Sequence, residues 1–125
     1  LLPIPKLLLP KKRKLLRTIS TGFINPILVK KVLLQRRLVT PRMLETFAAD
    51  TIPLFYKDLD YYEKIYGSYG HNFCASKSEM KNKIGEIIQD YKKYAIYRNY
   101  VRKYLISNHS YKRRIIDLKK IILNQ

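Results

Sequence analysis

Apolar residues recur at helical spacing over one long stretch in the second half of the chain. Between about residues 77 and 106 they follow one another in steps of three or four, which places them on one face of a helix. This apolar stripe consists of Met80, Ile84, Ile87, Tyr91, Tyr94, Arg98, Val101 and Leu105. Just before it, Ser76 and Glu79 fit a capping box, in which each side chain bonds the backbone N–H of the other residue. The pattern predicts one long helix over about residues 77–106, roughly 45 Å in length.

Arg98 interrupts the apolar stripe of this helix. A buried charge without a partner is very costly, so the guanidinium needs one. We expect an acidic residue from the middle of the chain, a phosphate, or an acid of a neighbouring subunit in that role. The alternative is that the side chain reaches solvent.

A second stripe occupies another face of the same helix, in its C-terminal half. Its residues are Lys93, Tyr97, Tyr100 and Tyr104, with Lys92, Asn99 and Lys103 beside them. A surface helix ordinarily has one apolar stripe and a charged back. An apolar front together with a tyrosine and lysine back predicts contacts on both sides. The second contact is either with nucleic acid or with another protein helix.

One more helix is predicted at the end of the chain, after a break at residues 107–110. It extends from Tyr111 to about Leu123, and its apolar stripe is formed by Tyr111, Ile115, Leu118 and Ile122. We expect it to fold back on the long helix as a C-terminal antiparallel helical hairpin.

Prolines mark the expected helix starts in the first half of the chain. Asn25-Pro26 and Thr40-Pro41 each combine a capping residue with proline in the first turn. They predict helices to about Arg37 and Ala49. A further helix is expected from Pro53 to about Tyr66, ended by Gly67. Because no segment shows convincing strand alternation, the predicted fold class is all-α with about five helices.

Residues 1–25 differ from the rest of the chain. Pro3, Pro5 and Pro10 prevent a continuous helix, and the segment is basic and lacks acids. It resembles a mitochondrial targeting sequence. We expect either an extended basic arm that a partner orders or an untrimmed leader. Residues 26–125 then form a single small helical domain.

Charge is distributed unevenly along the chain, which has 26 Lys and Arg, 9 Asp and Glu and a net charge of +17. Both ends are basic, and the segment between about residues 45 and 90 is slightly acidic. Such a surplus predicts binding to a polyanion. The candidate RNA-binding residues are Lys11, Lys12, Arg13, Lys14, Arg17, Lys30, Lys31, Arg36, Arg37, Arg42, Lys92, Lys93, Tyr97, Tyr100, Arg102, Lys103, Tyr104, Lys112, Arg113 and Arg114.

Catalytic chemistry has little support in the sequence. His71 and Cys74 are two metal-ligand types, whereas a closed zinc site needs four ligands and the chain has one cysteine. Asp58, Asp60 and Glu63 are expected on a solvated helix face. We therefore predict a non-enzymatic protein without a cofactor, a metal or a small-molecule substrate.

In its general character the chain resembles mitochondrial ribosomal proteins, which are small, very basic and built from an extended arm plus helices. The resemblance implies a structural role in the mitochondrial matrix, with rRNA and other ribosomal proteins as partners. Two alternatives are an accessory subunit of a mitochondrial inner-membrane complex, such as a respiratory or ATP synthase complex, and a DNA-packaging protein. No apolar run is long enough to predict a transmembrane helix.

Overall fold

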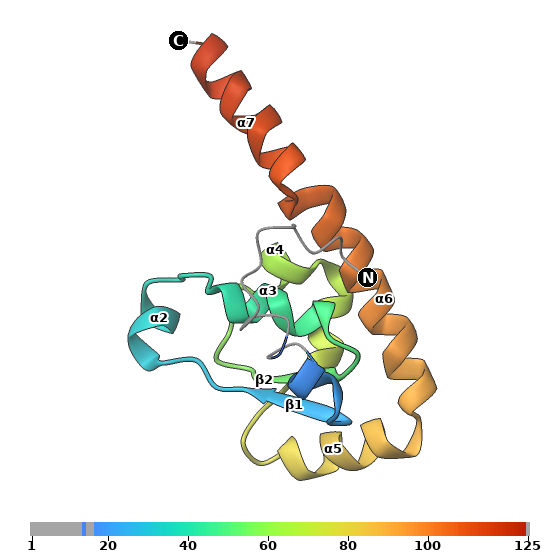
Figure 1. The fold of residues 1–125 in the computed structure, drawn as a ribbon. Helices are drawn as coiled ribbons and strands as arrows, with labels where there is room; N and C mark the ends of the chain where they lie inside the picture. The colour runs from blue at the N-terminus through green and yellow to red at the C-terminus, as the bar shows by residue number, and fades with distance from the viewer. Residues whose placement is uncertain (1–13, 15–16, 125) are drawn as a thin grey trace.

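Three short parallel strands form the centre of the molecule. The computed structural model describes residues 14 and 17–124, and its sheet has the order β1-β2-β3. These strands are β1 (Ile24–Ile27), β2 (Ile52–Tyr56) and β3 (Cys74–Ala75). Helices surround the sheet and one extends away from it (Figure 1). The prediction of an all-α fold is therefore wrong, because the fold is a mixed one with a parallel sheet.

Two of the expected helix starts lie in strands. Asn25 and Pro26 belong to β1, and Pro53 belongs to β2, where it lies opposite Asn25. β2 is buried on both faces along most of its length, so it shows a continuous apolar run and no alternation. Pro53 precedes the point where β3 pairing begins, at Phe55 opposite Cys74, so its missing N–H breaks no bond to β3. β1 also spans the expected boundary between residues 25 and 26.

Helices connect the parallel strands. α2 (Lys31–Gln35) and α3 (Pro41–Ala48) lie between β1 and β2, and α4 (Tyr62–Tyr66) and the 3-10 helix η1 (Ser68–Phe73) lie between β2 and β3. The helix predicted after Thr40 is confirmed as α3. Of the helix predicted from Pro53, only the final part is helical. It ends at Gly67 as expected, with φ of 74°.

The predicted long helix is broken into two. α5 (Met80–Gln89) and α6 (Tyr91–His109) meet at Asp90, and the chain turns sharply there (Figure 1). Asp90 leaves the helical conformation, with φ of −131° and ψ of 60°, and its carboxylate accepts from Lys93 N–H at 3.2 Å. An aspartate in this position caps a new helix, which is why the continuous prediction fails. The capping box at Ser76 and Glu79 is present.

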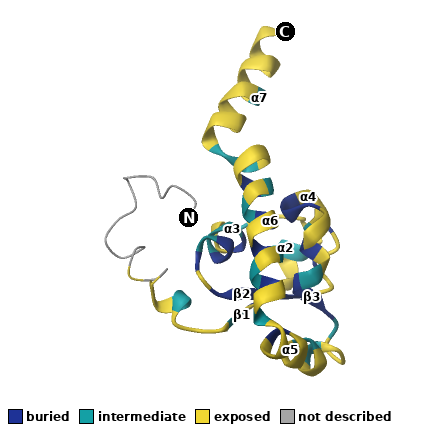
Figure 2. Cartoon of the chain, turned by 90° about the vertical axis from the view of Figure 1, so that its right-hand side faces the viewer, coloured by how far each residue is buried: buried dark blue, intermediate teal, exposed yellow. Residues whose placement is uncertain are grey.

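α6 packs its apolar stripe on the core. Its buried residues are Tyr94, Arg98, Val101 and Leu105, as the stripe predicts. Beneath them lies an aromatic cluster in which Phe47 contacts Tyr66, Phe55 and Phe73 with ring centroids 4.7–6.1 Å apart. Figure 2 shows this buried interior and the exposed outer face of α6.

The predicted C-terminal hairpin is absent from the described residues. α7 (Tyr111–Leu123) leads away from the body instead of folding back on α6 (Figures 1 and 2). α6 continues to His109, so Ser110 alone separates the two helices. Ser110 caps α7, with its hydroxyl accepting from Arg113 N–H at 3.2 Å. One extended residue bends the chain, whereas a helical hairpin needs a loop of two to five residues.

Candidate nucleic-acid interface

A stack of tyrosines lies where η1 packs against α6. Tyr69 of η1 stacks on Tyr100 with ring centroids 4.5 Å apart and planes 16° apart, and it lies 5.6 Å from Tyr97. Tyr69 is 38% exposed and Tyr100 is 44% exposed. The pair is therefore partly open to solvent, although each of these two rings already covers one face of the other.

Two lysines flank these rings. The Lys93 ammonium lies 5.9 Å from the Tyr97 ring centroid, and the Lys103 ammonium lies 5.9 Å from that of Tyr100. Both distances allow cation–π attraction. We call the set Tyr69, Tyr97, Tyr100, Lys93 and Lys103 the aromatic–lysine face. It offers cations for phosphates, phenol hydroxyls for hydrogen bonds, and ring edges and outer faces for bases or riboses.

Tyr104 faces inward from the second stripe. It is half-buried, and its ring lies so close to Gly67 that a Cβ on that glycine would be 2.7 Å from a ring carbon. Tyr97 is half-buried as well. The prediction that α6 has contacts on both sides is thus met within the chain, because α4 and η1 pack against the tyrosine side.

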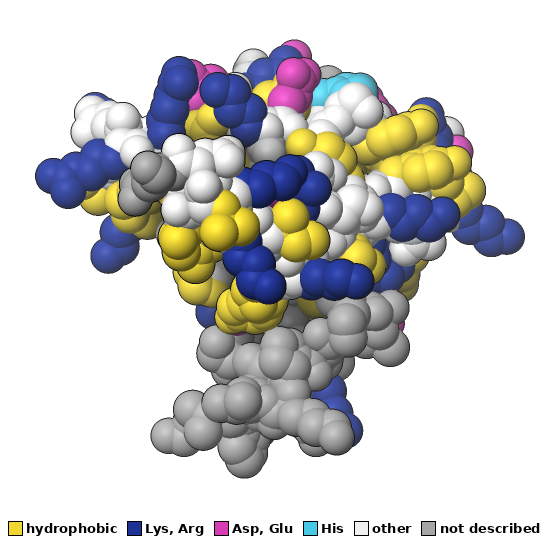
Figure 3. Space-filling view, turned by 90° about the horizontal axis from the view of Figure 1, so that it is seen from above, with side chains coloured by type: hydrophobic (Ala, Val, Ile, Leu, Met, Phe, Trp, Pro, Cys, Tyr) yellow, Lys and Arg dark blue, Asp and Glu magenta, His cyan; other side chains and the backbone are white. Residues whose placement is uncertain are grey.

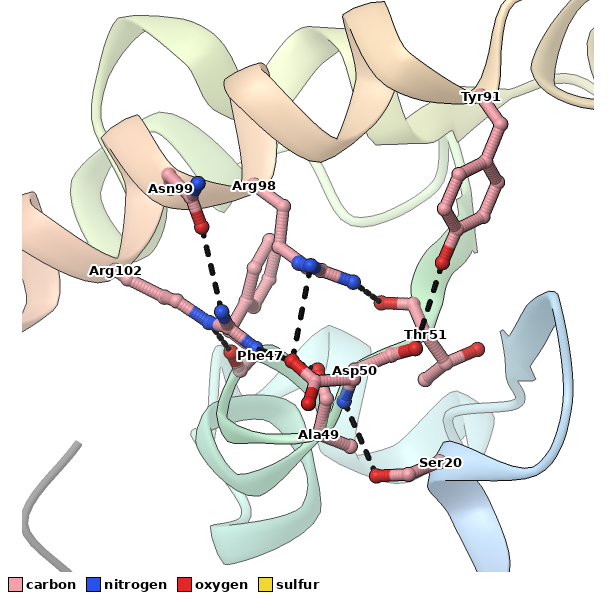
Figure 4. A network of polar contacts seen from close by, with 9 residues as sticks. All are labelled: Ser20, Phe47, Ala49, Asp50, Thr51, Tyr91, Arg98, Asn99 and Arg102. Atoms are coloured by element: carbon pink, nitrogen blue, oxygen red, sulfur yellow. Dashed lines mark hydrogen bonds and ion pairs between the residues drawn. The ribbon is translucent and has the colours of Figure 1, made fainter. Parts of the chain in front are cut away.

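Arg98 and Arg102 form a polar network with the loop between α3 and β2 (Figure 4). The Arg98 guanidinium donates to Thr51 O at 3.3 Å and lies 3.7 Å from the Asp50 carboxylate. Arg102 donates to the carbonyl groups of Phe47 and Ala49 and to Asp50 at 3.0 Å. The hydrogen bond from Arg102 holds the pKa of Asp50 below its usual value, although partial burial opposes the shift.

Because of this network, Arg102 differs from the other candidate RNA-binding residues. Its side chain is only 12% exposed, and its guanidinium nitrogens bond to groups of the protein itself. We therefore leave Arg102 out of the candidate interface. The expectation that an acid from the middle of the chain pairs with Arg98 is confirmed by Asp50, while the Arg98 Nε has no hydrogen-bond partner among the described residues.

The other basic residues are exposed and spread over several sides of the molecule. Those described are Lys14, Arg17, Lys30, Lys31, Arg36, Arg37, Arg42, Lys92, Lys112, Arg113 and Arg114. Lys11, Lys12 and Arg13 lie outside the described residues. α2 and α6 are on opposite sides of the sheet (Figures 1 and 2). Figure 3 shows Lys and Arg side chains dispersed among hydrophobic ones, with few acids between them.

Some of the exposed basic groups already have partners. Arg37 pairs with Asp60 at 3.0 Å, and Arg113 pairs with Asp117 at 3.3 Å. Arg114 lies 3.1 Å from a ring nitrogen of His109. Such exposed pairs are weak, so a phosphate competes with them readily.

The sequence did not predict three residues that belong with the candidate RNA-binding residues. Tyr69 lies outside both stripes of the predicted long helix, and nothing in its spacing links it to Tyr100, which is 31 positions away. Lys119 and Lys120 extend the exposed basic surface of α7. These two lysines were predictable, because they follow Lys112 and Arg113 at the helical interval of seven residues.

A separate polar cavity of about 660 Å³ lies beside the carboxyl ends of β2 and β3. It is lined by Lys57, Asp60, Tyr62, His71, Cys74, Glu79, Asn82, Lys83 and Glu86. Burial raises the pKa of the Cys74 thiol to about 12, so this thiol stays protonated. The His71 ring lies 2.5 Å from Ser68 O and is exposed. His71 thus lies in η1, and Cys74 is a buried thiol.

Comparison with protein-family models, curated proteins and solved structures finds no match to this chain. Within the described part of the chain, no helix combines the length and the apolar character that crossing a membrane requires.

Proposed function

We propose that this chain is a structural, RNA-binding constituent of a ribonucleoprotein, and that the particle is a mitochondrial ribosome. The observation that carries the RNA proposal is the aromatic–lysine face of α6. Lys93 and Lys103 are exposed there and Lys92 is exposed beside Lys93 on α6, and none of the three has an ion pair among the described residues. Unpaired lysines beside partly open tyrosine rings suit the phosphates and the unstacked bases of RNA.

The remaining basic groups support a position between several RNA segments. They lie on α2, α6 and α7, which face different directions (Figures 1 and 2). A protein that reads a single duplex gathers its cations on one face. Cations on several sides suit a subunit that is surrounded by polyanion, and the net charge of +17 is then neutralised on binding. The assignment to mitochondria rests on the presequence-like residues 1–25.

Sedimentation of the native particle tests this proposal. The full-length protein is tagged, and a lysate is separated on a gradient at moderate salt with and without ribonuclease. We expect the protein to sediment with rRNA and to leave the fast fractions after ribonuclease treatment. Ribonuclease-resistant sedimentation in a detergent-solubilised membrane complex would reject the ribosomal role and favour the inner-membrane alternative.

A second candidate function follows from the cavity at the ends of the parallel strands. Lys57 follows β2 and Glu79 follows β3, so the cavity lies where the chain leaves the sheet. Lys57 pairs with Glu79 at 2.8 Å and Lys83 pairs with Glu86 at 2.9 Å, so the charged groups largely neutralise one another. A lining of paired charges, an amide and a phenol favours an uncharged ligand rich in hydroxyl groups.

Binding of neutral saccharides tests this second function. In NMR titrations of the labelled protein, a ligand in the cavity shifts the signals of Lys57 and Asn82, and Asn82→Leu weakens the response. Lys64→Gln is the matched surface control and leaves it unchanged. If millimolar saccharide moves neither signal, the cavity is a solvated groove and this candidate is rejected.

A further inference from the structure

α7 leaves an apolar stripe in water. It has no buried residue, and the exposed fractions of Tyr111, Ile115, Leu118 and Ile122 lie between 53% and 79%. These four follow one another in steps of four, three and four residues, the spacing of a seam between packed helices. An isolated helix of this length is marginally stable in water, so α7 gains stability from any surface that covers the stripe.

The charges beside the stripe are unneutralised. Lys112 and Lys119 border it on one side, and neither has an ion pair among the described residues. Asp117 is the only acid of α7, and it pairs with Arg113 on the far side of the helix. The surface that covers α7 therefore has to supply both apolar area and negative charge.

We propose that α7 docks in an apolar groove of a neighbouring protein whose rim carries carboxylates. The stripe occupies the groove, and Lys112 and Lys119 pair with the rim. A second copy of this chain would bring like charges together along the seam. RNA supplies charge without apolar area for Ile115 and Leu118. The exposed apolar residues of α7 also include Ile116, Ile121 and Leu123. A lipid surface suits a helix whose charged residues gather on one side, whereas Lys112, Arg114 and Lys119 lie between the apolar residues of α7.

Photo-crosslinking in the native assembly identifies the occupant. A photoreactive benzoylphenylalanine replaces Leu118 in the stripe, or Lys120 on the opposite side as the matched control, in the tagged full-length chain. We expect Leu118 to crosslink to a protein segment that contains apolar residues and Asp or Glu. Crosslinks from Leu118 to RNA, to lipid or to a second copy would overturn the proposal. Equal yields from the two positions would do so as well.

Removal of charge tests the carboxylate rim. Lys112→Gln with Lys119→Gln removes two charges beside the stripe, and Arg113→Gln with Lys120→Gln removes two on the far side. We expect the first pair to lower the Leu118 crosslink yield by roughly tenfold, which is about 1.4 kcal/mol, and the second pair to lower it much less. Equal losses of crosslink yield in the two variants would contradict carboxylates beside Lys112 and Lys119. Circular dichroism of both variants reports whether α7 stays helical.

The docking of α7 does not depend on RNA binding by α6. Crosslinking after mild ribonuclease treatment separates the two. A protein crosslink from Leu118 that persists when the particle no longer sediments with rRNA supports docking. Loss of the crosslink under these conditions shows that RNA covers the stripe or holds the occupant, and contradicts direct docking. A ribonuclease-resistant particle that keeps the crosslink rejects the RNA role and leaves the docking supported.

Discussion

Arg98 and Arg102 differ from the lysines of α6 because their side chains bond groups within the protein. Both lie on the inner side of α6 and bond the loop between α3 and β2. Arginine suits this place because its planar fork donates to several acceptors at once, and a loop offers carbonyl oxygens in that arrangement. Lys103, the next residue after Arg102, points to solvent. Whether a basic side chain of α6 is bound or exposed depends on its position around the helix and on the loop between α3 and β2, which is distant in sequence.

Arg102→Ala tests the structural role of this side chain. We expect the free energy of unfolding to fall by about 2–3 kcal/mol, because four acceptors lose a charged donor. Asp50 is mostly exposed and regains water, which keeps the loss below that of a fully buried pair. Lys103→Ala is the matched control and is expected to change stability by less than about 0.5 kcal/mol. Urea unfolding measures both, and equal effects would contradict the structural role of Arg102.

Glu79 gives the fold a defined sensitivity to acid. Hydrogen bonds from Lys57 and from the Ser76 backbone and hydroxyl lower the pKa of Glu79 from 4.5 to about 2. A lowered pKa in the folded state contributes stability above the unfolded value, and this contribution is lost as the pH falls from 4.5 towards 2. Glu79→Gln removes it. We expect the unfolding midpoint of this variant to fall less over this range than that of the wild type.

The measurement is urea unfolding followed at several pH values. Asp58→Asn, in the exposed loop after β2, serves as the control for loss of one surface carboxylate. It is expected to follow the wild-type pH profile. If Glu79→Gln also follows the wild-type profile, the interactions of Glu79 with Lys57 and Ser76 contribute no acid-sensitive stability.

At the scale of elements, a capping residue followed by proline occurs in two different structures. Thr40-Pro41 starts a helix, whereas Asn25-Pro26 lies in a strand. The residues that follow decide the difference, because α3 has polar positions on one side, whereas Pro26 is followed by the apolar run Ile27–Val29, in which Ile27 is buried where β1 pairs with β2. Short parallel strands lack alternation, so periodicity cannot distinguish them from buried helix. The apolar stripe of α6 was predictable because a long helix repeats its period several times.

Replacement of Gly67 and of Gly85 by alanine is expected to change the stability of the protein in opposite directions. Gly67 has φ of 74° and lies against the Tyr104 ring, whereas Gly85 lies in α5 with no atom within 4 Å of an added Cβ. Gly67→Ala is expected to destabilise the protein by about 1–3 kcal/mol through backbone strain and the displaced ring. Gly85→Ala is expected to stabilise it by about 0.5–1 kcal/mol. Urea unfolding of both variants is the measurement, and a neutral Gly67→Ala would contradict the packing of Tyr104.

For the molecule as a whole, the sequence predicted the charge of the surface better than the shape of the molecule. The excess of Lys and Arg remains exposed at most predicted positions of the described chain, because long charged side chains seldom find buried partners. The partner of Tyr100 could not be foreseen, because Tyr69 reaches it through a tertiary contact. The direction of α7 depended on one residue, Ser110, whose conformation the local sequence leaves open.

Exposed cations on several sides, with an aromatic–lysine face on α6, lead to the central claim that this chain binds RNA through α6. The measurement is the affinity for a single-stranded RNA of mixed sequence over a series of salt concentrations. One variant changes Lys92, Lys93 and Lys103 to Gln. The matched control changes Lys64, Lys77 and Lys81 to Gln, which removes the same charge from the near-neutral middle of the chain.

If the three α6 lysines each contact a phosphate, the slope of log affinity against log salt becomes shallower by about 2 in the α6 variant. The control is expected to keep nearly the wild-type slope. Equal slopes for the two variants would mean that total charge alone governs binding, and this result would contradict the assignment of the interface to α6.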